Sequence, residues 1–329
     1  MSWVIIAVIA YLVIAIQTIL DKFLLSSDRV SHPTIYAFYS GVLSLATLII
    51  FPVAVYLIKI SDFLLKLFPG VAEVKFHFMG AGEISLAIFS GAVFTFGILY
   101  LFFAFQKNEA SRVVSVVGAT VPIITFLLSF ILFGVMLNVN QIIGVIALIV
   151  GGLVISLEAK LNKVGKKFFS GFAYSIIAGI LFGLASTIFK KLYDVDSFSN
   201  VFLWTRVGLF AGAVAILVLP KWRKIIVNSF FGLNKEKKKN SQTGALFVGT
   251  KILGGVGSIL LQKSISLGEV TSVNALVSIE YVFILMIGLG LSLRWPNIFH
   301  EKMKSSIIIQ KVIAIIIISL GLFSLYLGT

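Results

Sequence analysis

Three ionisable side chains lie inside long apolar runs of this 329-residue chain. Arg206 lies in VFLWTRVGLF, Lys251 in GALFVGTKILGG and Glu280 in VSIEYVFILMIG. At the centre of a membrane-spanning helix, a charged side chain costs about 2.5–3.5 kcal/mol on insertion scales. Such a group therefore needs an opposite charge or a water-filled cavity. We expect Glu280 to form an intramembrane charge pair with Lys251 or Arg206, and the alternative is that Glu280 carries a proton.

The apolar segment 243–262 carries polar side chains at helical spacing. Lys251, Ser258 and Gln262 share one face of a helix, because residues about three to four positions apart, or multiples of that, line up along it. A polar stripe of this kind lines a cavity or lets a neighbouring helix approach closely. The lysine favours the cavity, and both interpretations stay open at this point.

The segment 270–292 divides its polar side chains between two faces of the expected helix. Asn274, Ser278 and Tyr281 fall within about 60° of one another at 100° per residue. Glu280 lies about 120° away from Asn274 on the same helical wheel. We therefore expect the asparagine, serine and tyrosine to face a cavity, and the glutamate to face a neighbouring helix.

The composition places these charges in a membrane protein. Hydrophobic residues make up 59% of the chain, charged residues 12%, and the mean hydropathy is +1.08. A water-soluble domain of this composition could not cover its own apolar surface. Apolar runs of about 20 residues fit helices that cross a hydrocarbon core of about 30 Å, and they lack the alternation of barrel strands. The sequence therefore predicts an all-α polytopic membrane protein.

The composition also limits the chemistry. The chain has no cysteine, which excludes disulfides and thiolate chemistry. The histidines His32, His77 and His300 lie outside the apolar runs and lack the spacing of metal ligands, so we expect no metal and no cofactor. The net charge of +14 is concentrated between the apolar runs. This placement indicates orientation in a membrane, with no nucleic-acid partner.

The apolar runs predict ten transmembrane helices. We place them at 3–20, 34–58, 84–106, 111–136, 141–157, 168–189, 199–220, 243–262, 270–292 and 307–327. The connection 59–83 is expected to hold a short interfacial helix, and the basic connection 221–242 is expected to be a loop.

The two halves of the chain resemble each other. QTILDKFL (17–24) aligns with STIFKKLY (186–193), and the offsets between other matched segments change only in connections. With five spans in each half, the second copy crosses the membrane in the opposite sense, so the duplication predicts two inverted five-helix repeats. We place the first repeat at 1–160 and the second at 161–329.

An inverted repeat of this kind builds its site near the membrane midplane, between the two halves. Tyr39 overlies Arg206 in the repeat, and Pro122 distorts the fourth span and frees a backbone carbonyl. We expect the following residues to line the cavity: Tyr39, Ser115, Pro122, Lys251, Ser258, Asn274, Ser278 and Tyr281.

Four features of the chain resemble the EamA-type transporters, the ten-helix branch of the drug/metabolite transporter superfamily. They are the five-plus-five repeats, a lysine ending the first helix of each half (Lys22 and Lys191), the short link QKNEAS, and a divided Glu-Pro element. That element has Pro122 without a glutamate in the first half, and Glu280 followed by Tyr281 in the second. The resemblance covers the whole chain.

The resemblance implies a secondary transporter, and not an enzyme, that moves small metabolites by alternating access. The substrates it implies are amino acids or related compounds, usually exported, with protons as a candidate coupling ion. One alternative is a flippase for a lipid or a lipid carrier. Another is a membrane enzyme acting on a lipid-linked substrate, although the scattered acidic residues form no catalytic cluster.

The orientation in the membrane has two interpretations. Lys and Arg are concentrated in the odd-numbered connections, which places these in the cytoplasm and both termini outside. The family resemblance implies both termini in the cytoplasm. In either orientation, we expect a multi-pass protein of the inner (cytoplasmic) cell membrane.

Overall fold

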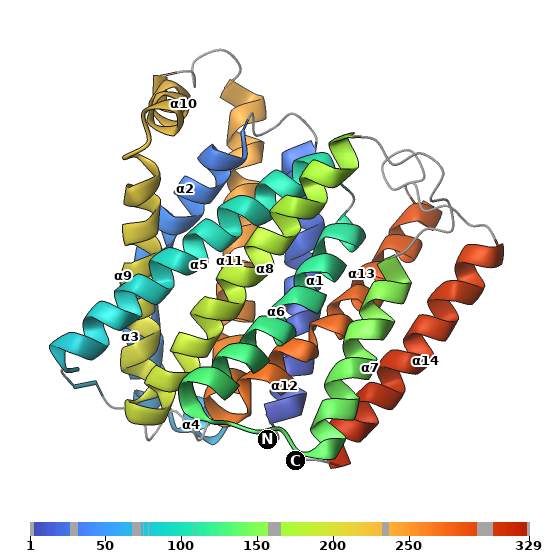
Figure 1. Ribbon diagram of the computed structural model, residues 1–329. Helices are drawn as coiled ribbons and strands as arrows, with labels where there is room; N and C mark the ends of the chain where they lie inside the picture. Colours follow the sequence, from blue (N-terminus) through green and yellow to red (C-terminus); the bar gives the residue numbers. More distant parts are fainter. Residues whose placement is uncertain are drawn as a thin grey trace.

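The computed structural model of this chain describes residues 3–26, 32–67, 74, 76–77, 79–108, 110–156, 166–231, 237–294 and 305–327. All regular secondary structure in these ranges is helical (Figure 1). Long apolar helices run through the molecule from one end to the other. The expected fold class, an all-α polytopic membrane protein, is confirmed.

The helices of the first half end at α7, and those of the second half begin at α8. In chain order they are α1 (Trp3–Ser26), α2 (Pro33–Leu43), the 3-10 helix η1 (Ser44–Ala46), α3 (Thr47–Ile60), α4 (Asp62–Leu67), α5 (Ala81–Lys107), α6 (Ala110–Phe133), α7 (Val139–Ser156), α8 (Lys166–Val195), α9 (Phe198–Ile216), α10 (Pro220–Phe231), α11 (Lys237–Leu267), α12 (Val270–Ala275), α13 (Val277–Arg294) and α14 (Ser305–Leu327).

Helices occupy every range predicted to cross the membrane. Within the described residues, eight segments are long and apolar enough to span a bilayer, and α2, η1 and α3 together form one of them. α7 contains a shorter apolar stretch, Val139–Val154, and α14 is an apolar helix of 23 residues. The count of ten crossings and the division near residue 160 stay predictions.

Two expectations about connections have different outcomes. The short helix expected between residues 59 and 83 is present as α4. The basic segment expected to be a loop instead begins with α10, which packs against α2 and is seen end-on in Figure 1. Ile226 of α10 is buried while Arg223 and Lys224 are exposed, so an apolar face against α2 stabilises this helix.

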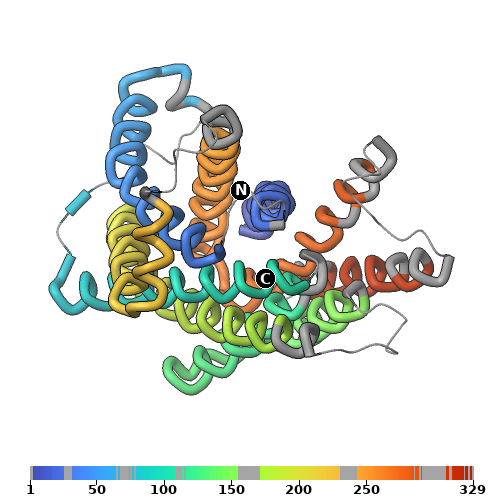
Figure 2. The backbone as a smooth tube through the Cα atoms, turned by 90° about the horizontal axis from the view of Figure 1, so that it is seen from above, coloured from blue at the N-terminus to red at the C-terminus, as the bar shows by residue number. Residues whose placement is uncertain are grey.

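Helices of the two halves pack on one another in matching pairs. α5 lies along α8, and α1 lies along α11, so that the third helix of each half contacts the first helix of the other. α7 lies along α14 in the same way, fifth helix against fifth. Seen from above, α1 lies between α11 and α13 (Figure 2).

Glycines allow two other helix pairs, α5 with α9 and α6 with α8, to approach closely. A Cβ built on Gly208 of α9 would lie 2.9 Å from the Cα of Gly91 on α5, too close for any side chain. A Cβ on Gly179 of α8 would meet Thr120 of α6 at 2.6 Å. These glycines therefore serve helix packing.

The segment expected as one helix at 270–292 is divided at Leu276 into α12 and α13. Around the division, Leu276 N donates to Val273 O at 3.2 Å and Ile279 N donates to Leu276 O at 2.9 Å. Both bonds join residues three positions apart, as in a 3-10 helix, whose backbone turns by about 120° per residue, compared with about 100° in an α-helix. Side chains on α13 are therefore rotated away from the positions that a straight helical wheel assigns to them.

His32 caps the N-terminus of α2 and lies just outside the apolar span. Its Nδ1 accepts a hydrogen bond from Thr34 N at 3.2 Å, and Pro33 occupies the first helical turn. Burial, and then the positive charge of Lys221 on α10, lower the pKa of His32 below its ordinary value of about 6.5. The folded protein therefore favours the neutral, hydrogen-bond-accepting imidazole at the start of α2.

We expect acid to destabilise the protein through His32. Because the pKa is lower in the folded chain than in the unfolded one, the unfolded chain binds this proton more readily, and stability falls as the pH drops through about 6.5. The Tm should fall less steeply on acidification in His32→Asn, since asparagine caps the helix without titrating. Identical pH profiles of Tm for the two proteins would contradict this role.

Candidate functional site

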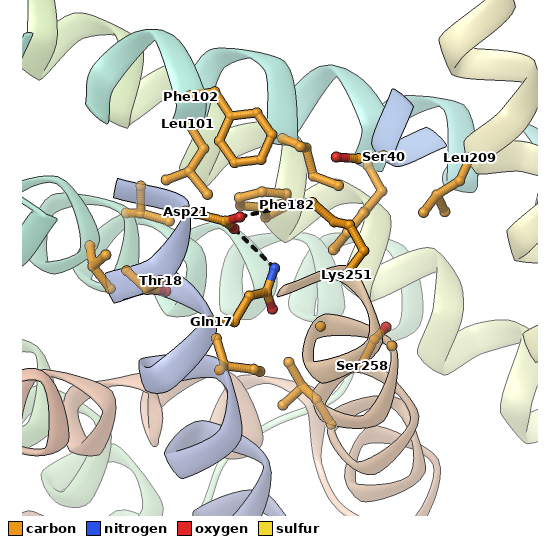
Figure 3. Close-up of a pocket in the computed structure, with 18 of the residues that line it drawn as sticks. Gln17, Thr18, Asp21, Ser40, Leu101, Phe102, Phe182, Leu209, Lys251 and Ser258 are labelled. Carbon is orange, nitrogen blue, oxygen red and sulfur yellow. Dashed lines mark hydrogen bonds and ion pairs between the residues drawn. The ribbon is translucent and has the colours of Figure 1, made fainter. Parts of the chain in front are cut away.

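A cavity of about 280 Å³ lies inside the bundle. Its lining combines α1, α2, η1, α3, α5 and α6 from the first half with α8, α9, α11, α12 and α13 from the second. Figure 3 shows one part of it, where Asp21 and Thr18 of α1 face Lys251 and Ser258 of α11. Much of the remaining lining is aromatic or aliphatic. The cavity therefore presents a few polar groups on an apolar wall, as small-molecule sites do.

Lys251 forms a buried ion pair with Asp21. The Lys251 Nζ lies 3.0 Å from Asp21 Oδ1, and the two side chains are 10% and 4% exposed. Asp21 also accepts hydrogen bonds from Tyr36 OH and, at 3.1 Å, from Gln17 Nε2. The expected pairing of Lys251 with Glu280 is therefore wrong. Sequence reasoning missed Asp21 because the first span was expected to end at residue 20, whereas α1 continues to Ser26.

Glu280 lines the cavity instead of facing away from it. It is buried, and its Oε1 accepts a hydrogen bond from Thr18 Oγ1 at 2.8 Å. Among the described residues, no ion pair joins Glu280 to Lys251 or Arg206. The expected charge pair and the expected orientation of Glu280 are both corrected. The rotation of α13 at the Leu276 division accounts for the orientation.

Ser278 and Tyr281 point away from the cavity, contrary to expectation. The Ser278 hydroxyl donates to Leu148 O of α7 at 2.7 Å, and the Tyr281 hydroxyl donates to Val114 O of α6 at 2.6 Å. Both side chains are buried, and neither belongs to the lining. They tie α13 to the first half. The same rotation of α13 turns these two side chains away from the cavity and turns Glu280 toward it.

Arg206 of α9 lines the cavity without a carboxylate partner among the described residues. Its Nη2 donates to Ser258 Oγ at 3.2 Å, and its guanidinium carbon lies 4.3 Å from the ring centre of Phe202. Its Nε is a buried donor with no acceptor among the described atoms. The Nδ2 of Asn274, also on the lining, is a second such donor. The cavity therefore holds unmatched hydrogen-bond donors beside an unmatched positive charge.

Comparison with known proteins relates the sequence of the first half to a family. Residues 1–157 match the model of the EamA-like transporter family. The match covers 157 of the 329 residues, so the first half of the chain is similar in sequence to EamA-like transporters. The resemblance inferred from the repeats, the lysines and the QKNEAS link is confirmed by this match.

A solved structure has a fold similar to that of the full chain. Its title reads only "Crystal structure of protein", and the alignment covers 97% of this chain and 99% of that chain. The sequences are 14% identical and the TM-score is 0.60, so the likeness shows a shared fold alone. A search of curated proteins gives no match.

The structure distributes the remaining expected site residues differently. Tyr39 is half-buried and packs edge-to-face with Phe38 and Phe247, outside the cavity lining. Pro122 is buried in α6 beside the lining, and its carbonyl accepts from Thr125 Oγ1 at 3.0 Å. Ser115 lies in α6, and its side chain falls outside the described residues.

Of the expected cavity residues, Lys251, Ser258 and Asn274 belong to the lining. Sequence reasoning missed the polar face of α1, which contributes Gln17, Thr18 and Asp21. The match of Thr18 to Thr187 in the repeat was a signal that this part of α1 has a role beyond crossing the membrane.

Proposed function

We propose that this chain is a secondary transporter that moves small metabolites by alternating access between two inverted five-helix repeats, residues 1–160 and 161–329. The exchange of partners between halves supports this proposal, since α1 lies along α11 as α5 lies along α8. In such an arrangement, rocking one half on the other opens the shared cavity to each side of the membrane in turn. We propose the inner cell membrane as its location.

One observation carries the substrate proposal: the cavity contains a cation and a carboxylate that do not neutralise each other. Arg206 and Glu280 both line it, and the hydrogen bonds that they make there go to the hydroxyls of Ser258 and Thr18. Unpaired charges inside a membrane protein are costly, and they mark sites for charged ligands. A zwitterion complements both groups, with its carboxylate at Arg206 and its ammonium at Glu280.

Amino acids and related compounds are therefore the substrates that we propose. The Nδ2 of Asn274 adds a donor for the substrate carboxylate. The cavity volume of about 280 Å³ is close to the lower end of the range of about 300–1,000 Å³ found for small-molecule sites. The direction, export, rests on the family resemblance alone. In the absence of substrate, a proton on Glu280 would remove its charge, so exchange of substrate for a proton fits the same site.

The substrate proposal is tested by counterflow in proteoliposomes. We expect vesicles preloaded with unlabelled amino acid to accumulate the labelled amino acid, and N-acetyl and methyl ester derivatives to compete poorly. Loss of one partner of a buried charge pair costs about 2–5 kcal/mol, roughly thirty-fold or more in affinity. If the derivatives competed with the labelled amino acid as well as the unlabelled amino acid does, the proposed zwitterion site would be wrong. Flux of labelled lipid without flux of amino acids would favour the flippase.

A further inference from the structure

The Lys251 ammonium lies in a cage of aromatic rings. Its Nζ is 4.2 Å from the ring centre of Tyr36, 5.1 Å from that of Phe102 and 5.5 Å from that of Phe247. Aromatic faces attract a cation, and the attraction is stronger where water is excluded. Together with the Asp21 carboxylate at 3.0 Å, these rings surround one ammonium group with the features that recognise an ammonium ligand.

The surroundings of Asp21 fix it in place as a receptor for that ammonium. Tyr36 OH donates to Oδ1, and Gln17 Nε2 donates to Oδ2 at 3.1 Å. Both donors come from the first half, so the carboxylate stays oriented whether or not Lys251 is beside it. Asp21, Gln17, Phe102 and Lys251 all belong to the cavity lining (Figure 3). A ligand in the cavity therefore has direct access to this site.

We propose that Asp21 and the rings of Tyr36 and Phe102 form an organic-ammonium subsite, in which Lys251 is a tethered occupant that a primary ammonium ligand displaces. The subsite deepens the proposed function, on which it rests for the movement that withdraws Lys251. Its ligand class is a primary alkylammonium group, free or as the end of a larger substrate.

Displacement follows from where the parts of the subsite are attached. Asp21, Tyr36 and Phe102 belong to α1, α2 and α5 of the first half, whereas Lys251 belongs to α11 of the second, as does Phe247, which moves with it. A movement of one half against the other pulls the ammonium away from Asp21. Removing one member of a buried ion pair is costly, because it leaves the other charge uncompensated. An incoming ammonium restores neutrality at Asp21, and the released Lys251 enters a cavity that Glu280 also lines.

The recognition part of the proposal is tested by chemical complementation of Lys251→Ala in the purified full-length protein. This substitution removes three methylenes and the ammonium, which n-propylammonium replaces. We expect n-propylammonium to raise the Tm of Lys251→Ala saturably, by about 3 °C or more, while n-propanol, of the same shape without charge, has little effect. If Lys251→Ala can be purified in a folded state only in the presence of n-propylammonium, that stabilisation also supports the subsite.

Matched controls separate the subsite from general effects of an amine. The double variant Asp21→Asn/Lys251→Ala should lose the response, because the carboxylate is gone. Lys263→Ala should not respond, although Lys263 is also on α11 and its Nζ lies 5.1 Å from the ring centre of Phe198. A Tm rise no larger than that given by n-propanol, an equal rise in the double variant, or no recovery of folded Lys251→Ala with either compound would overturn the proposal.

Displacement in the protein with Lys251 present is measured by the distance between α1 and α11. The chain has no cysteine, so spin labels attach only at introduced sites such as Ile16→Cys and Val256→Cys, which are 38% and 46% exposed. We expect n-propylammonium, and not n-propanol, to populate a second distance. A single unchanged distance at concentrations that saturate Lys251→Ala would refute displacement. Neither the Tm nor the spin-label distance depends on transport. A negative result in these two measurements can therefore be distinguished from a negative result in counterflow.

Discussion

Arg206→Met is expected to reduce amino-acid binding by roughly thirty-fold or more while leaving the protein folded. The guanidinium is the only group on the cavity lining that combines a positive charge with no carboxylate partner among the described residues. Methionine keeps the apolar stem and its contact with Phe202 but removes the charge and the donors. Binding is measured by equilibrium dialysis of labelled amino acid with purified protein.

The stability of Arg206→Met distinguishes a binding role from a structural one. A buried charge that stabilises the fold through a partner leaves that partner uncompensated when it is removed. Arg206 has no carboxylate partner among the described residues, and the Ser258 hydroxyl that loses its bond still accepts one from Gln262 Nε2 at 3.3 Å. We therefore expect a Tm equal to or above that of the original protein.

Two further variants sharpen the Arg206 test. Arg206→Lys keeps the charge and loses the planar fork, so it should bind with intermediate affinity. Arg223→Met, on the exposed face of α10, removes an arginine outside the cavity and should bind normally. Full binding by Arg206→Met would contradict the proposed carboxylate site, and a collapse of Tm would make Arg206 a structural residue instead.

Glu280→Gln is expected to lower amino-acid affinity by a similar factor, roughly thirty-fold or more. Glutamine has the same shape, and its amide oxygen can still accept the Thr18 hydroxyl, which donates to Glu280 at 2.8 Å. What is lost is the negative charge that we assign to the substrate ammonium. Counterflow in proteoliposomes measures the loss, and Glu83→Gln, at the exposed start of α5, is the matched control.

The same variant separates ammonium binding from proton coupling at Glu280. Counterflow exchange needs no proton movement, whereas accumulation against a gradient of substrate needs a driving ion. If Glu280 carries the proton, Glu280→Gln should lose accumulation driven by a pH gradient. Unchanged accumulation in Glu280→Gln would exclude proton coupling through this carboxylate, and unchanged counterflow would exclude it as the ammonium site.

The fold class and several site residues could be predicted from the sequence because they depend on local composition. Apolar runs long enough to span a bilayer must form helices there, since unpaired backbone groups are too costly in lipid. A charged or polar side chain in such a run must turn toward other protein groups or a cavity. This reasoning selected Lys251, Ser258 and Asn274, which lie on the cavity lining, and Arg206, a buried charge that also lies there.

Partner choice and helix rotation could not be predicted, because they depend on groups far apart in the chain. Asp21 lay just beyond the first predicted span, 3–20, and only the packing of α1 along α11 brings it to Lys251, 230 residues later. Glu280 was assigned to the wrong face because a helical wheel assumes an unbroken helix. The division at Leu276 rotates α13, so that Glu280 meets Thr18 while Tyr281 meets Val114.

The sequence by itself determined that this chain is a helical membrane protein with buried charges, since the cost of exposing polar groups to lipid acts on each segment separately. Only the tertiary structure decided which charges neutralise each other. Glu280 was expected to be half of an ion pair, and instead it is a carboxylate on the wall of a cavity that Arg206 also lines. Pairing energies fall steeply with distance, so the chemistry of the site was decided by how α1, α9, α11 and α13 pack together.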